Sequence, residues 1–83
     1  MVSVTDVAII LVQKFREQNL KRARISEQQL KKLAGRRKIR GGFFAMIRDE
    51  LDACDIIFFE LDRGGYGLLP STALDGATIL KTE

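Results

Sequence analysis

The chain has 83 residues, of which 46 % are apolar and 30 % are charged, and its formal net charge is +3. A chain of this length is expected to fold as one domain, 1–83, which buries only about 60–65 % of its unfolded surface. It has no His and a single Cys, Cys54, which excludes the familiar zinc sites and the Cys–His or Ser–His nucleophile pairs.

These limits also bear on function and compartment. We expect no enzyme, and no metal, cofactor or small-molecule substrate is evident. No apolar run approaches the roughly 20 residues that a membrane helix needs, and residues 1–12 lack the basic leader and small-residue cleavage site of a signal peptide. Because one thiol cannot form an internal disulfide, a reducing compartment is favoured, and we expect a cytoplasmic protein.

A first helix is predicted to begin after Ser3 and to run to about Lys21. Ser3 and Asp6 have the spacing of a capping box. Apolar residues then recur at three- and four-residue intervals, which places them on one helical face. They are Val4, Val7, Ala8, Leu11 and Phe15.

A second, shorter helix has the clearest start signal in the chain. Residues 26–29, Ser-Glu-Gln-Gln, form a capping box, and Ile25 and Leu30 are placed for its hydrophobic staple. Gly35 is a natural end, because glycine adopts the left-handed conformation without steric cost. The preceding link, Ala23–Ile25, is predicted to be a minimal strand.

A third helix follows the glycines at positions 41 and 42. Its apolar residues cluster on one face, which we expect to be buried. They are Phe43, Phe44, Ile47, Leu51 and Cys54.

From residue 56 the apolar pattern alternates, as it does in a strand. Ile57, Phe59 and Leu61 would face one way, which leaves Phe58 out of phase and, we expect, exposed. Residues 62–65, Asp-Arg-Gly-Gly, are typical of a hairpin turn. Residues 66–69 return as a second strand closed by proline, and the remaining residues favour a turn at 75–76 and a short strand at 78–80.

Positive charge is concentrated in one part of the chain. Residues 14–40 hold eleven of the fourteen basic residues and only two acids, so this stretch carries 11 − 2 = +9, while the other residues carry 3 − 9 = −6. Dense positive charge attracts polyanions, because binding releases condensed counterions from nucleic acid. The alternatives are a solvated helix face, or a patch for an acidic protein or a membrane surface.

The order of elements resembles the winged-helix variant of the helix-turn-helix fold over residues 3–70. This resemblance implies an α+β domain in which three helices are followed by a β-hairpin wing. In that fold the start of the third helix approaches the major groove of DNA, and the tip of the hairpin touches the backbone or the minor groove.

The resemblance also implies a set of DNA-contacting residues. The groove-facing segment would be Arg36, Arg37, Lys38 and Arg40 with the two glycines that follow, and Arg63 would be the wing contact. Arg and Lys bind phosphate, and Arg can read guanine with a bidentate fork. Lys31 and Lys32 would add phosphate contacts from the second helix. We therefore expect a non-catalytic protein that binds double-stranded DNA as a regulator or accessory factor.

The outer face of the third helix departs from that pattern, because it is acidic at Asp49 and Asp52, where phosphate would be repelled. The alternative function is a protein-interaction module that uses this acidic helix and the apolar outer side of the first helix. RNA binding is a third possibility, which the absence of an RNP aromatic pattern and of a G-x-x-G loop disfavours.

The first helix also suggests self-association. Residues 7–12 are all apolar, which is more than one buried face can use. On a helical wheel Ile9, Arg16 and Leu20 share the far side, so we expect them to contact a partner. A two-fold homodimer through this helix would present two basic turns to two half-sites of DNA.

Overall fold

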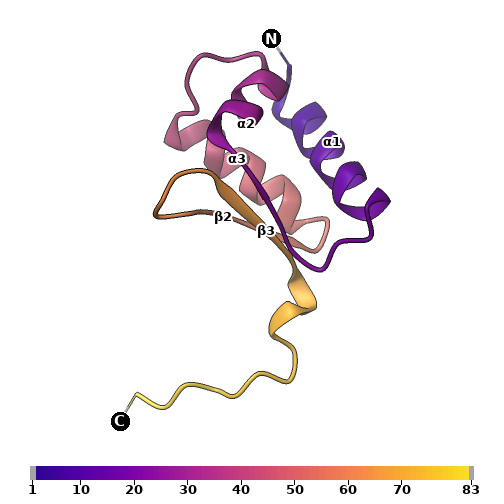
Figure 1. Cartoon of the computed structure of the whole chain (residues 1–83), viewed down its shortest axis with the longest axis vertical. Coiled ribbons are helices and arrows are strands. Elements are labelled where there is room, and N and C mark those ends of the chain that lie inside the picture. Colours follow the sequence, from indigo (N-terminus) through magenta and orange to yellow (C-terminus); the bar gives the residue numbers. More distant parts are fainter. Residues whose placement is uncertain (1, 83) are drawn as a thin grey trace.

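The computed structural model describes residues 2–82, which form three helices, three strands and a short 3₁₀ helix (Figure 1). In chain order these are α1 (Val4–Glu17), β1 (Ala23–Ile25), α2 (Glu27–Ala34), α3 (Gly41–Asp52), β2 (Ile56–Glu60), β3 (Tyr66–Pro70) and η1 (Ser71–Leu74). The strands make one antiparallel sheet in the order β1-β3-β2. The predicted α+β class, three helices followed by a hairpin, is confirmed, and the order is compatible with a winged-helix topology.

The predicted helix starts are confirmed by their hydrogen bonds. Ser3 Oγ accepts a bond from the Asp6 N–H at 3.1 Å. At α2 both bonds of the capping box form between Ser26 and Gln29, each at 3.0 Å. Gly35 ends α2 in the left-handed conformation with φ of 64°, as predicted. The minimal strand Ala23–Ile25 also forms and pairs with β3.

The end of α1 differs from the prediction. The helix ends at Glu17 rather than near Lys21, because Asn19 turns the chain in the left-handed conformation with φ of 52°. The Leu20 N–H then bonds back to the Phe15 carbonyl at 3.4 Å. Leu20 therefore lies in the link to β1 and not on the helix.

The core lies between the sheet and the helices, and α1 packs against α3 (Figure 1). The buried faces of α1 and α3 agree with the apolar periodicity, although Val4 and Phe44 are only partly buried, and Cys54, also partly buried, lies beyond the end of α3. At the sheet, the rings of Phe44, Phe58 and Tyr66 stack with centroids 5.3–5.6 Å apart. The fully buried large side chains are Phe58, Leu30, Ile47, Leu51 and Val7.

The expected exposure of Phe58 is wrong, because its side chain is only 1 % exposed. Pairing with β3 places Phe58 opposite Leu68, on the face that the helices cover. Ile57 and Phe59 take the outer face, where the Phe59 ring lies across Gly67 on the neighbouring strand. The alternation of apolar residues predicts that the strand has two faces, but packing decides which of them is covered.

The segment after β3 leaves the sheet and extends away from the domain (Figure 1). The predicted turn forms at Asp75 and Gly76, and Gly76 has φ of 78°. The predicted strand at 78–80 does not form, because no other segment of residues 2–82 pairs with it, and Ile79 remains 87 % exposed. Among residues 2–82, no helix has the length and apolar character needed to cross a bilayer.

Candidate nucleic-acid interface

A shallow depression brings together basic residues from three separate parts of the chain. Lys31 comes from α2, Arg37 from the turn that follows it, and Arg63 from the tip of the β2–β3 hairpin. The start of α2 and the hairpin glycines complete the lining, which comprises Ser26, Glu27, Gln28, Lys31, Arg37, Arg63, Gly64 and Gly65. Three of the seven predicted DNA-contacting residues therefore meet at one surface.

The hairpin glycines hold Arg63 beside α2. Gly64 and Gly65 both have positive φ, at 96° and 84°, and the turn is closed by a bond from the Leu61 N–H to the Gly65 carbonyl at 3.0 Å. A Cβ atom at Gly65 would come within 2.9 Å of the Ile25 carbonyl oxygen. Only glycine fits this close approach, so the tip lies directly against the junction between β1 and α2.

The charge of the depression is mainly uncompensated. Lys31 Nζ lies 3.3 Å from a carboxylate oxygen of Glu27, one turn earlier on α2, so this lysine is partly neutralised. Within residues 2–82 the other ion pair joins Arg48 to Asp49, which leaves Arg37 and Arg63 without an acidic partner. Both arginines are exposed. They can therefore bind an anion without first breaking an internal contact.

The other predicted basic residues lie outside this depression. Lys32 is exposed on α2, and Lys38 and Arg40 are exposed in the turn before α3. Arg40 is the N-cap residue of α3, where its side chain makes no capping bond. Lys38 and Arg40 directly precede the start of α3, whose free backbone N–H groups carry partial positive charge.

Arg36 has a packing role instead. Its guanidinium carbon lies 3.9 Å from the ring centroid of Phe43, a cation–π contact, and its Nε is buried without a hydrogen-bond partner. The side chain is only partly exposed. Arg36 is therefore held by the core and is poorly placed to reach phosphate.

We predict that Arg36→Ala lowers the free energy of unfolding by about 1 kcal/mol, because it removes a cation–π contact and the packing of the arginine stem. Chemical denaturation of the variant and the parent measures this difference. Arg37→Ala is the matched control, because Arg37 is exposed and should change stability by less than about 0.5 kcal/mol. Equal effects of the two substitutions would contradict the packing role.

The outer face of α3 is acidic, as the sequence indicated. Asp49, Glu50 and Asp52 are exposed, and Met46 on the same side is 51 % exposed. The two glycines that begin the helix are also open, since a Cβ atom added to either would meet nothing within 4 Å. The first turn of α3 is thus accessible and uncharged, whereas its later turns would repel phosphate.

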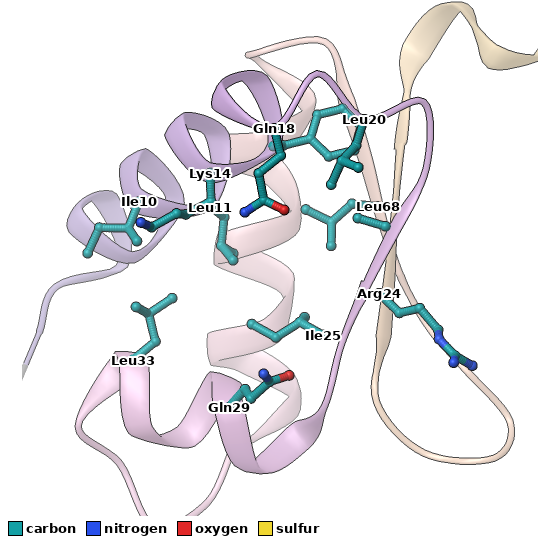
Figure 2. A pocket seen from close by; sticks show the side chains of 12 residues that line it. Ile10, Leu11, Lys14, Gln18, Leu20, Arg24, Ile25, Gln29, Leu33 and Leu68 are labelled. Carbon is teal, nitrogen blue, oxygen red and sulfur yellow. The ribbon is translucent and has the colours of Figure 1, made fainter.

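An apolar groove separates α1 from β1 and α2 (Figure 2). The aliphatic side chains of Leu11, Ile25 and Leu33 point into it, and the amide heads of Gln18 and Gln29 lie at its rim. Twelve residues line it: Ile10, Leu11, Lys14, Phe15, Gln18, Leu20, Ala23, Arg24, Ile25, Gln29, Leu33 and Leu68.

Ile9, Arg16 and Leu20 do not form one continuous stripe of α1, and their contact with a partner stays a prediction. Leu20 lies beyond the end of α1 and lines the groove at the opposite end from Ile10 (Figure 2). Arg16 reaches the turn that follows α3, where its Nη2 donates to the Cys54 carbonyl at 3.4 Å. Ile9 is 48 % exposed and is then the single aliphatic residue of the predicted stripe that remains on α1. One exposed aliphatic side chain is ordinary for a protein surface.

Three residues at the start of α2 that line the depression were not predicted from the sequence, namely Ser26, Glu27 and Gln28. The signal was present, because a capping box marks the exposed start of a helix, but the sequence does not tell which distant segment covers it.

Nearby, burial raises the pKa of Tyr66, and the charges of Glu27 and Glu60 raise it further. Within residues 2–82, no group of three or more His, Cys, Asp or Glu residues could hold a metal ion.

Comparison with known proteins gives no relative: no family model, no curated protein and no solved structure matches the chain.

Proposed function

We propose that the protein binds double-stranded DNA without catalysis, in the manner of a winged-helix domain, as a regulator or accessory factor. One observation carries the proposal: Lys31, Arg37 and Arg63, which are far apart in the sequence, converge on one open depression. Arginines without acidic partners bind phosphate by charge-assisted bonds and release counterions from DNA. The β2–β3 hairpin and α2 would contact the phosphate backbone of the DNA at this depression.

The basic turn and the start of α3 would supply the groove contacts. Lys38 and Arg40 are exposed directly before α3, and the open glycines at its start allow the DNA backbone to come close. The N-terminus of a helix attracts phosphate through its free N–H groups. Because Asp49 and Asp52 follow on the outer face, only the first turn of α3 would enter the groove.

A titration of labelled duplex DNA and labelled single-stranded RNA at two salt concentrations tests this function. We expect tighter binding to the duplex and a strong loss of affinity at the higher salt concentration. Equal affinity for both nucleic acids would favour general attraction to phosphate, and no binding at the lower salt concentration would exclude the proposal.

A second prediction tests whether the outer face of α3 lies close to the bound DNA. Asp49→Asn together with Asp52→Asn should tighten duplex binding by a few-fold near physiological salt, because two charges that repel phosphate are removed. The gain should fade as salt rises. Binding measured by fluorescence anisotropy gives both results, and an unchanged affinity near physiological salt would place this face away from DNA.

The alternative is a protein-interaction module, which the acidic outer face of α3 favours. A basic partner would dock on Asp49 and Asp52, so the same double substitution would weaken that complex rather than strengthen it. The sign of the change therefore separates the two functions.

A further inference from the structure

The sheet has a free edge on β2, and its backbone groups can be assigned. The Leu61 N–H donates to the Gly65 carbonyl at 3.0 Å, and the Ser71 N–H donates to the Asp55 carbonyl at 2.8 Å. Both bonds continue the register in which Ile57 faces Leu69. Because the hydrogen-bonding direction alternates along an antiparallel strand, the N–H and C=O groups of Ile56, Phe58 and Glu60 point to the free edge.

This edge has little of the usual protection against pairing. Native proteins guard edge strands with charged side chains, proline or bulges, whereas β2 reads Ile-Ile-Phe-Phe-Glu and carries a single charge, at its last residue. A hollow runs beside the edge, lined by Arg48, Asp49 and Asp52 of α3 and by residues 56–58 of β2. On the outer face Ile57 and Phe59 remain half-buried. The edge thus has room and apolar surface for another strand.

The chain also carries an unpaired strand-like segment. Residues 77–81, Ala-Thr-Ile-Leu-Lys, follow the turn at Gly76 and are all exposed. Ile79 is 87 % exposed and Leu80 is 83 % exposed, and they are the two most exposed large apolar residues of the described chain. The segment extends away from the domain, so it covers no surface of its own chain (Figure 1).

We propose that residues 77–81 of one copy pair with the free edge of β2 in a second copy, and that two copies exchange these segments reciprocally. Each copy offers the five-residue edge strand β2 and one segment, whereas the other edge strand, β1, has only three residues. A two-fold dimer therefore satisfies both, and such closed pairs are the commonest oligomers. The added strand would bond to the outward-facing backbone groups of Ile56, Phe58 and Glu60, as strand addition does generally. The predicted strand at 78–80 then forms only in the dimer.

The side chains of the segment suit both faces of the edge. Neighbouring residues of a strand point to opposite faces, so one of Ile79 and Leu80 would cover the outer apolar surface at Ile57. The other would enter the hollow beside α3. If Ile79 takes the hollow, Lys81 shares its face and can approach Asp49 and Asp52, whose charges it complements.

Sedimentation velocity over a range from low to about a hundred micromolar tests the dimer. We expect the parent to associate, and Ile79→Asp with Leu80→Asp to raise the dissociation constant by roughly a hundredfold or more, because apolar side chains are replaced by charges. The double variant should fold normally, since these residues contact nothing in the domain. A parent that stays monomeric throughout would overturn the proposal.

Two further variants separate strand pairing from other modes of association. Leu74→Asp is the matched control, because Leu74 is also 68 % exposed but lies before the pairing segment, and it should leave the dimer intact. Ile9→Glu should leave it intact as well. If either variant dissociates the dimer as fully as the change at 79 and 80, contact through the exposed apolar surface or through α1 explains association, and strand exchange does not.

Amide hydrogen exchange measured by NMR provides a readout of the edge itself. In the dimer the N–H groups of Phe58 and Glu60 should be protected, and in the Ile79→Asp, Leu80→Asp variant they should exchange at least about tenfold faster. The N–H groups of Ile57 and Phe59, which face β3, should stay protected in both proteins. Equal exchange of Phe58 and Glu60 in parent and variant would exclude pairing at β2.

Discussion

Replacing Arg37 and Arg63 together with alanine is expected to weaken binding to every DNA duplex by roughly fiftyfold at about 0.1 M salt. The two guanidinium groups border one depression, and within residues 2–82 neither has an acidic partner. Each phosphate contact makes the slope of log K against log salt more negative by about 0.9. One contact therefore raises the affinity by close to tenfold at about 0.1 M salt, relative to 1 M. Because the two contacts act independently, the loss of affinity on removing both is the product of the two single losses.

The salt dependence should change together with the affinity. If the parent neutralises about four to six phosphates, its slope is about −4 to −5, and the double variant should be shallower by about 1.8. Fluorescence anisotropy at four or more salt concentrations gives both slopes. A weaker affinity with an unchanged slope would mean that the substitutions disturbed the fold rather than the phosphate contacts.

Lys21→Ala with Arg22→Ala is the matched control for charge. These residues belong to the same basic stretch, and their loss changes the net charge by the same amount. They lie in the link after α1, at the opposite side of the domain from the hairpin tip (Figure 1). We expect a loss of only a few-fold for this control. An equal loss in both variants would indicate diffuse attraction by the total charge and would contradict a localised interface.

The local signals in this sequence predicted most of the fold. The capping box at Ser26, the stop at Gly35 and the turn at residues 62–65 each act through their own backbone, so neighbours in sequence are sufficient to specify them. The end of α1 was predicted wrongly because the local signal there is ambiguous. Asn19 is compatible with a helix and with a left-handed turn, and nothing in the adjacent residues decides between them.

The candidate site was less predictable, because it depends on contacts between distant segments. Charge and composition marked the basic stretch, but they could not separate Arg36, which is held over Phe43, from Arg37, which is free of such contacts. Nor could they show that the hairpin tip lies against the start of α2, since that proximity comes from the close approach of Gly65 to Ile25. Neighbouring arginines therefore have different roles for reasons that only the packing reveals.

The second large expected effect is a loss of stability on replacing Phe58, which lies on the buried face of β2. Phe58→Ala should lower the free energy of unfolding by about 3–5 kcal/mol, the usual cost of removing a buried phenyl ring. The side chain is 1 % exposed and stacks on Phe44 and Tyr66, with ring centroids 5.3 Å away in each case. Substitution would leave a cavity between the sheet and α3, because the remaining rings cannot move together without shifting their own backbones.

Phe59→Ala is the matched control, since it removes the same ring from the next position of the same strand. Phe59 lies on the outer face across Gly67, where it is only partly buried, so we expect a loss of about 1 kcal/mol. Urea denaturation followed by circular dichroism compares the two variants with the parent. If Phe58→Ala is too unstable to study, Phe58→Leu should still cost about 1–2 kcal/mol. The opposite ranking, with Phe59 the costlier residue, would mean that the outer face of the sheet is the covered one, as alternation in the sequence first suggested.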